Sequence, residues 1–190
     1  GSTTKPFFGL AGLEYSVMGH KNSVFCGGYY LLPNEERKYR DWKKTGHGKM
    51  DLEGAITQSC DVYFYSLSYS LGIDRMSEFM QQFGFGERTG IDSTSEQPGL
   101  LPSREWKRRT KGMPWFPGET LITGIGQGAL LTTPLQLASA TGALAMKGRR
   151  FKPHLVKSVN QQPSHEFVNI EPEVAGEYKL KKEINWQHII

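Results

Sequence analysis

Long apolar runs and cysteines are scarce in this chain of 190 residues. No stretch approaches the roughly 18 consecutive apolar residues that a transmembrane helix needs, and no secretory signal is recognisable. With only two cysteines, Cys26 and Cys60, a disulfide-rich scaffold is excluded, but one disulfide or two metal ligands are allowed. The chain therefore carries no address of its own, and its abrupt start and end lead us to expect part of a larger protein.

The composition fits a globular protein with a mildly basic surface. Hydrophobic residues make up 37% and charged residues 22%, which is enough for one core in one domain or in part of a larger one. The formal net charge is +4, and this could suit an anionic partner. The densest basic run, 104–111, is short, so we interpret it as a solvated loop or helix face. No broad basic patch or recognisable module indicates nucleic-acid binding.

A serine followed three residues later by a lysine opens the chain, as Ser2 and Lys5. On a helix these positions share a face, so the Lys5 amine can lie beside the Ser2 hydroxyl. A neutral lysine there would act as a general base, and burial disfavours its charged form. A helix N-terminus would favour negative charge on the serine oxygen, and Pro6 fits the first turn. The pattern alone is weak evidence, since most chance matches are surface turns and Gly1-Ser2 can also be a cloning remnant.

The spacing of hydrophobic residues, together with residues that cap or terminate helices, predicts mostly helices separated by irregular segments. We expect a buried helix over 5–15, then a long connection over 18–49 with short strands such as 29–32. Such a long connection is usually functional or tied down. Helical spacing resumes at Asp51, and the apolar segment from Val62 ends at Gly72. Asp74 can cap the next helix, and its apolar stripe at i, i+3, i+4 and i+7 predicts core. The stripe consists of Met76, Phe79, Met80 and Phe83.

The second half of the chain gives weaker patterns. Residues 86–118 contain four prolines and are expected to be mostly loop. The glycine-dense run 124–128 lacks the lysine of a phosphate loop and the spacing of a dinucleotide site, so a nucleotide site is disfavoured. Thr133-Pro134 predicts a capped helix that ends at Gly148. We expect a strand over 151–159 and a helix beginning within 177–190. His154, His165 and His188 are expected to be ordinary surface or strand histidines.

Taken in order, the motifs identify a family. The chain resembles the transpeptidase domain of class B penicillin-binding proteins, and within them the penicillin-binding protein 2 branch, which acts in cell elongation. The matches cover about residues 1 to 155 and are highly specific in combination, and Lys5-Pro6-Phe7 continues the first motif past the possible cloning remnant. The matching stretches are 1–7, 39–44, 46–48, 59–65, 71–74, 89–92, 102–107, 124–128 and 133–136.

The resemblance assigns roles to four residues. Ser2 would be the nucleophile, Lys5 its base, and Ser59 and Asp61 the second motif, Ser-x-Asp. A plain helix cap is the other interpretation of Ser59, and both roles can hold at once. The family's third motif, Lys-Ser/Thr-Gly, lies on an edge strand that the family places after the helix expected near Ile184, so we expect that strand to be missing from these residues. That strand supplies part of the oxyanion hole in the family, so we expect these 190 residues alone to be inactive or nearly so.

The resemblance also implies a fold and a cellular setting. The fold class would be α/β (α+β), the penicillin-binding and serine β-lactamase-like fold, present here as its mostly helical part. Residues 1–190 would be a partial transpeptidase domain, and 18–50 an inserted irregular segment. The implied reaction is peptidoglycan D,D-transpeptidation, with stem peptides as substrates, β-lactams as inhibitors and the cell-elongation machinery as partner. The implied location is the periplasmic side of the bacterial inner membrane.

Four residues around the inserted segment could bind zinc: Cys26, Asp41, His47 and Cys60. Two sulfurs, one nitrogen and one oxygen would complete a closed tetrahedral structural site. A metal bound there would stabilise the long polar segment, which has little hydrophobic core. Some members of the resembled branch carry a structural metal at matching positions. The alternatives are a disulfide between the two cysteines or two buried free thiols. His20 is a possible substitute ligand.

Two further functions remain open at this point. A serine β-lactamase or D,D-carboxypeptidase of the same superfamily would share Ser-x-x-Lys but favour water as the acyl acceptor. A non-catalytic, metal-stapled binding module is an alternative of a different class. Acceptor preference cannot be deduced from the motifs alone, so these possibilities need experiments on the protein.

Overall fold

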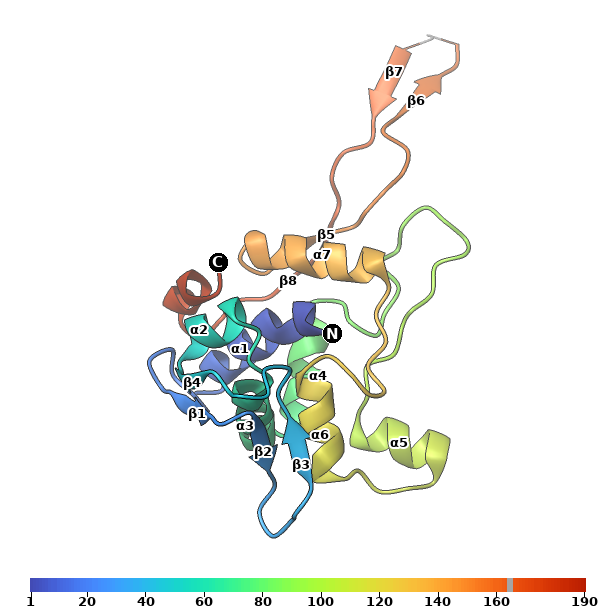
Figure 1. Ribbon diagram of the computed structural model, residues 1–190. Helices are drawn as coiled ribbons and strands as arrows, with labels where there is room; N and C mark the ends of the chain where they lie inside the picture. The colour runs from blue at the N-terminus through green and yellow to red at the C-terminus, as the bar shows by residue number, and fades with distance from the viewer. Residues whose placement is uncertain (164–165) are drawn as a thin grey trace.

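Helices form most of the body of the molecule in the computed structural model, which describes residues 1–163 and 166–190 (Figure 1). Within these residues the helical elements outweigh the strands, as the sequence predicts. The α-helices are α1 (Lys5–Glu14), α2 (Leu52–Thr57), α3 (Asp61–Leu71), α4 (Ile73–Gln82), α5 (Arg104–Lys111), α6 (Pro117–Gly124) and α7 (Pro134–Ala145), and the 3-10 helices are η1 (Ser2–Thr4) and η2 (Glu183–His188).

The strands are short, and each pairs with a single antiparallel partner in the described residues. Two of these ladders lie in the segment 18–50, where the sequence predicts short strands: β1 (Val24–Cys26) pairs with β4 (Gly48–Met50), and β2 (Tyr29–Leu31) with β3 (Lys38–Arg40). Nearer the C-terminus, β5 (Arg149–Phe151) pairs with β8 (Val174–Glu177), and β6 (Ser158–Gln161) with β7 (Glu166–Asn169). The β6–β7 hairpin stands away from the body (Figure 1).

The core forms around α1, which is buried along most of its length. The Phe7 ring meets Phe83 and Phe85 edge to face, with centroids 5.3 and 5.0 Å apart. Each fully buried phenylalanine stabilises the fold by about 1.5–3 kcal/mol. Gly12 lets α3 approach closely, since a Cβ there would come within 2.6 Å of a Leu67 methyl group. This packing holds α1 against α3.

The apolar stripe predicted for the fourth helix is confirmed, but its predicted cap is wrong. Met76, Phe79 and Met80 are all buried in α4. The helix begins at Ile73, so its N-cap is Gly72. The φ of +76° at this position suits glycine. Asp74 therefore lies inside the first turn, where its carboxylate accepts a 2.9 Å hydrogen bond from Arg104.

The loop predicted over 86–118 is interrupted by a helix, and the strand predicted over 151–159 is divided. The basic run 104–111 forms α5, because Ser103 caps it and Gly112, at φ +63°, ends it. Only the ends of 151–159 are strand, in β5 and β6. The C-terminal helix is the short 3-10 helix η2, which is held by burial of Trp186.

The helix predicted from Thr133-Pro134 is confirmed as α7, and the Thr133 hydroxyl accepts a 3.1 Å hydrogen bond from the Gln136 amide. His165 lies outside the described residues. No helix in the described part of the chain is both long enough and apolar enough to cross a membrane.

Candidate functional site

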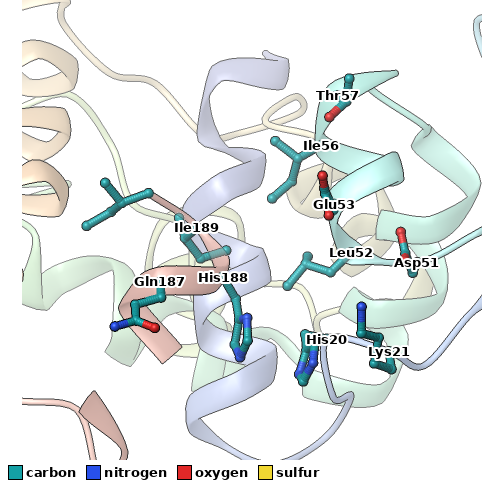
Figure 2. A pocket seen from close by; sticks show the side chains of 11 residues that line it. His20, Lys21, Asp51, Leu52, Glu53, Ile56, Thr57, Gln187, His188 and Ile189 are labelled. Atoms are coloured by element: carbon teal, nitrogen blue, oxygen red, sulfur yellow. The ribbon is translucent and has the colours of Figure 1, made fainter. Parts of the chain in front are cut away.

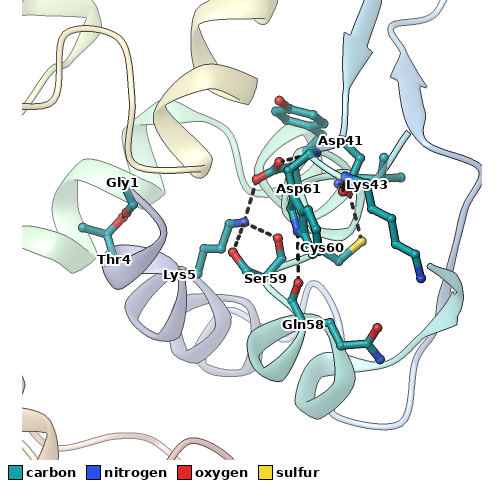
Figure 3. A network of polar contacts seen from close by, with 12 residues as sticks. Gly1, Thr4, Lys5, Asp41, Lys43, Gln58, Ser59, Cys60 and Asp61 are labelled. Carbon is teal, nitrogen blue, oxygen red and sulfur yellow. Dashed lines mark hydrogen bonds and ion pairs between the residues drawn. The ribbon is translucent and has the colours of Figure 1, made fainter. Parts of the chain in front are cut away.

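Lys5 is the centre of a buried polar network at the N-terminus of α1. Its side chain is 1% exposed, and its three N–H bonds have three acceptors (Figure 3). The Nζ atom donates to the Ser59 carbonyl oxygen at 2.8 Å, to the Ser59 Oγ at 3.1 Å and to Asp61 Oδ1 at 2.6 Å. All the donors of the ammonium group are therefore matched, as burial requires.

The backbone at Ser59 explains how this residue reaches Lys5. Ser59 has φ +53°, a left-handed conformation that costs a non-glycine residue about 1–2 kcal/mol. It ends α2, with the Ser59 amide bonded to Ile56 and the Cys60 amide to Ala55. This sharp turn between α2 and α3 presents both the carbonyl and the hydroxyl of Ser59 to Lys5. Strain of this kind concentrates at functional sites.

Asp61 begins α3 and joins two parts of the site. Its Oδ1 atom accepts from Lys5, while Oδ2 accepts a 3.2 Å hydrogen bond from the Trp42 amide. The Trp42 indole donates in turn to the Gln58 carbonyl at 3.1 Å. The carboxylate also benefits from its place in the first turn of α3, where the helix dipole favours negative charge.

Ser2 lies on the 3-10 turn immediately before α1 and is exposed. It is held by its neighbours: the Thr4 hydroxyl donates to the Gly1 carbonyl at 3.0 Å, and Gly126 packs so closely that a Cβ would clash with that same carbonyl oxygen. Lys5 is one helical turn away, but its recorded donors go to Ser59 and Asp61. The structure thus joins three of the four predicted residues by hydrogen bonds, and places Ser2 at the adjoining helix end.

The four predicted metal ligands form one cluster. One ligand atom from each of Cys26, Asp41, His47 and Cys60 lies within 4.8 Å of all the others. The Cys26 Sγ atom is 3.5 Å from Asp41 Oδ2 and 3.6 Å from His47 Nδ1, and the Cys60 Sγ atom is 3.4 Å from Asp41 Oδ2. The cysteines are free thiols, so the structure does not contain the alternative disulfide.

The cluster has the chemistry and dimensions of a closed zinc site. Zinc bonds of about 2.0–2.3 Å in a tetrahedron separate the ligand atoms by about 3.3–3.8 Å, close to the separations found here. Burial raises the pKa of the Cys60 thiol. Burial opposes ionisation of Asp41 as well, but hydrogen bonds from the Lys43 and Val62 amides outweigh it and hold the pKa of this carboxyl below its usual value. These four residues could hold a metal ion.

The cluster and the Lys5 network share one short segment. Asp41 accepts a 3.0 Å hydrogen bond from the Val62 amide at the start of α3. The next residue, Trp42, donates to Asp61, as described above. Cys60 itself lies between Ser59 and Asp61. The cluster therefore fixes the Ser-x-Asp turn from two sides.

A separate cavity of about 420 Å³ lies between α2, η2 and the segment after α1 (Figure 2). The His20 ring stacks on His188 there, with centroids 3.8 Å apart. His20 is therefore outside the metal cluster, and the substitute role predicted for it is wrong. None of the residues in the Lys5 network lines this cavity.

Sequence reasoning missed Trp42 as a residue of the site. Its backbone and indole both bridge the network, and its ring meets His47 at a centroid distance of 5.3 Å. The only available signal was its position beside Asp41 in a stretch that matches the family. No local pattern indicates which partner its amide will find.

Comparisons with known proteins agree with this geometry. A family model described as the penicillin binding protein transpeptidase domain matches residues 1–188. The peptidoglycan D,D-transpeptidase MrdA of Acinetobacter baumannii is 47% identical over 160 residues, covering 84% of this chain and 24% of the relative. MrdA of Haemophilus influenzae is 47% identical over 158 residues, covering 83% of this chain and 24% of the relative. The chain thus spans about a quarter of the length of these relatives.

Solved structures give the same result for the fold. PBP2 of Pseudomonas aeruginosa, in complex with WCK 5153, is 46% identical with a TM-score of 0.90, covering 100% of this chain and 42% of that one. PBP2 of Helicobacter pylori in complex with MreC is 32% identical with a TM-score of 0.81, covering 100% of this chain and 32% of that one. The predicted fold class, the mixed helix and strand fold of penicillin-binding transpeptidases, is confirmed.

Proposed function

Because this chain belongs to the penicillin binding protein transpeptidase domain family, we propose that the protein is a peptidoglycan D,D-transpeptidase with Ser2 as its nucleophile. The observation that carries the proposal is the convergence of Lys5, Ser59 and Asp61 in one buried hydrogen-bonded network at the helix end that bears Ser2. Chance Ser-x-x-Lys sequences on surface turns have no reason to bury their lysine against a second polar motif.

The proposed reaction begins with acylation of Ser2. In its neutral form Lys5 takes the hydroxyl proton while the Ser2 oxygen attacks the carbonyl of the penultimate D-Ala of a stem peptide. The tetrahedral intermediate then collapses, the peptide bond breaks, and the terminal D-Ala leaves as an amine. Ser59, whose Oγ is 3.1 Å from Lys5 Nζ, relays the proton to that amine.

The acyl group then passes to an amine of a neighbouring stem peptide. The amine attacks the ester carbonyl, loses a proton to the Lys5–Ser59 pair, and Ser2 recovers its hydroxyl proton. Asp61 holds Lys5 in position throughout by its 2.6 Å contact. The product is an amide cross-link between two strands, and no oxidant or external energy source is needed.

The third motif of the family, Lys-Ser/Thr-Gly, lies on an edge strand, whereas the Lys-Thr-Gly triplet at 44–46 of this chain lies in the loop between β3 and β4. We propose that the full-length protein supplies it, and that residues 1–190 alone acylate slowly or not at all. Loss of a single oxyanion donor lowers rates by about 10²–10³. We further propose that residues 1–190 are part of a transpeptidase domain and that 18–50 is an insertion in it.

The relatives suggest a cellular setting for the full-length protein. Solved relatives include PBP2 with MreC, a peptidoglycan synthase complex that coordinates polymerization and crosslinking, and PBP2 with WCK 5153. By this similarity we propose that the protein works with the cell-elongation machinery on the periplasmic side of the inner membrane, and that β-lactams acylate it.

We also propose that Cys26, Asp41, His47 and Cys60 hold one structural zinc ion. Support comes from the four buried or half-buried ligand atoms within 4.8 Å of one another and from a donor set of two sulfurs, one nitrogen and one oxygen. Bound zinc would tie the 18–50 segment to the Ser-x-Asp turn. It would take no part in the acyl transfer.

The proposal is tested by giving the full-length protein a pentapeptide donor and an amine acceptor and resolving the products by mass spectrometry. A transpeptidase forms the cross-linked peptide, and Ser2→Ala abolishes it. Hydrolysed tetrapeptide as the sole product would instead identify a D,D-carboxypeptidase, and rapid hydrolysis of penicillin a β-lactamase. Absence of every product would favour a non-catalytic binding module.

A further inference from the structure

A second cavity, of about 580 Å³, lies between the β2–β3 hairpin, the segment after α5 and helix α6. Figure 1 shows the hairpin beside α6, with α5 beyond it. Its size falls in the usual range for small-ligand sites, about 300–1,000 Å³. We propose that this cavity binds a sugar ring of the peptidoglycan glycan strand. The inference rests on the proposed function and adds a subsite for the part of the substrate that does not react.

Aromatic and apolar side chains line one side of the cavity. Phe116 is 48% exposed and Met113 is 47% exposed, and both line the cavity. Beneath them Trp115 is 9% exposed, and its indole donates to Thr120 at 2.8 Å. An exposed ring on a rigid support suits a ligand with a flat apolar face, such as the C–H face of a pyranose.

The charged groups of the cavity balance one another. Lys107 and Glu119 form an ion pair at 2.5 Å on the helix side, and Glu119 also accepts from the Phe116 amide at 2.8 Å. Glu35 and Arg37 supply one charge of each sign on the hairpin side. Two cations facing two anions favour a neutral ligand with many hydroxyl and amide groups. Stem peptides carry several carboxylates and are the poorer match.

Arg37 is the polar group best placed to contact such a ligand. Its guanidinium lies over the Tyr39 ring, 5.0 Å from the centroid, and is thereby held at the rim of the cavity. It has five N–H donors in a planar array, and hydroxyl and acetamido oxygens are acceptors for them. Tyr39 can pack close because Gly118 has no side chain, since a Cβ there would clash with the Tyr39 hydroxyl.

The position of the cavity fits a strand whose stem peptide occupies the Ser2 site. Gly128 and Ala129 line the cavity. Gly126, which packs against the Gly1 carbonyl beside Ser2, is two residues earlier. Two Cα steps span at most about 7.6 Å. A sugar in the cavity is therefore close to the residue that precedes the nucleophile, as covalent attachment between glycan and stem peptide demands.

The test measures binding of peptide-free glycan strands to full-length protein carrying Ser2→Ala; the strands are prepared with an amidase, and the lactyl carboxylates it exposes are converted to amides so that the probe is neutral. We expect binding by calorimetry, with affinity reduced about fivefold or more by Phe116→Ala and by Arg37→Ala. Lys38→Ala is the matched control, since Lys38 neighbours Arg37 but lies over Tyr29, outside the cavity lining. Should Phe116→Ala not fold, Phe116→Leu keeps the bulk and removes the ring.

Three outcomes would overturn the inference: no glycan binding, glycan binding unchanged in both cavity variants, or binding of a sugar-free stem peptide alone that the cavity variants weaken. Its failure is separable from failure of the proposed function. Penicillin acylation of Ser2 with no glycan binding would refute the sugar subsite alone, whereas loss of acylation in the wild-type protein would count against the enzyme.

Discussion

Lys5 Nζ lies 2.6 Å from Asp61 Oδ1, although 56 residues separate them in the sequence. The contact joins the N-terminal ends of α1 and α3, and the same two helices pack closely further along, at Gly12 and Leu67. Core packing and the candidate site are therefore one structural unit. A change in either partner should be visible in both stability and reactivity.

Asp61→Asn should lower both the stability of the fold and the reactivity of the site. The side chain keeps its shape and can still accept from the Trp42 amide, but a lysine that is 1% exposed loses its counter-charge. We expect a loss of about 2–3 kcal/mol in the free energy of unfolding, below the 3–5 kcal/mol typical when a fully buried pair is broken, because Asp61 is 14% exposed. Urea denaturation measures it. An unchanged midpoint would show that the pair contributes nothing.

Ser59→Gly should raise stability and lower reactivity. Glycine adopts the φ of +53° without strain, so the fold should gain up to about 1 kcal/mol. The hydroxyl that faces Lys5 is lost, and we expect acylation by penicillin to slow about 100-fold. Ser59→Ala is the control, because it removes the hydroxyl without relieving the backbone. Equal stability of the two variants would contradict the strain argument.

The metal proposal predicts about one zinc per chain by elemental analysis of protein purified without chelators. His47→Gln and Cys60→Ser should lose the metal and lower the melting temperature by about 5 °C or more, since the ligand no longer stabilises the native state. His20→Gln is the matched control, as that ring stacks on His188 away from the cluster. Zinc retained in Cys60→Ser would rule out the four-ligand site.

The phenols of Tyr15 and Tyr178 should ionise at a higher pH than an ordinary tyrosine. Burial, aided by the hydrogen bond to Glu78, raises the pKa of Tyr15 to about 12, and burial with the nearby Glu14 charge raises the pKa of Tyr178 to about 12. A raised pKa favours the neutral phenol in the folded state. The stability it contributes is therefore complete below pH 10, the unfolded value, and lost as pH rises to 12.

Absorbance at 295 nm, which follows phenolate formation, checks this prediction. Subtracting the titration curve of Tyr15→Phe from that of the wild-type protein isolates the Tyr15 phenol, which should ionise with a pKa of about 12. The same subtraction with Tyr178→Phe should give a pKa of about 12 for the Tyr178 phenol. A missing group that titrates near 10 in Tyr15→Phe would contradict the buried hydrogen bond.

The sequence predicts those parts of the fold that local patterns specify. The stripe with Phe79 and the Thr133 cap carry their own signals and were located correctly. Helix α6 was missed because Pro117, Gly118 and Gly124 resemble loop residues. It forms because Glu119 accepts from the Phe116 amide, which is a local helix cap, and because Leu121 is fully buried, which is a tertiary effect.

The candidate site, like the fold, could be predicted from the sequence only in part. Ser2, Lys5 and Ser59 were found by spacing and family resemblance, and all are at or beside the network. The Trp42 amide bond to Asp61 has no sequence signal, because it depends on how the 18–50 segment folds back onto α3. The cavity of about 580 Å³ beside α6 could not be predicted from the sequence either, because its walls come from three separate segments.

Formation of an acyl-enzyme on Ser2 can be observed directly. Full-length protein is incubated with benzylpenicillin, digested and mapped by mass spectrometry. We expect a single penicilloyl adduct on the peptide containing Ser2 and Lys5, absent in Ser2→Ala and formed more slowly in Ser59→Ala. No adduct on the wild-type protein, or an adduct on another serine, would contradict it.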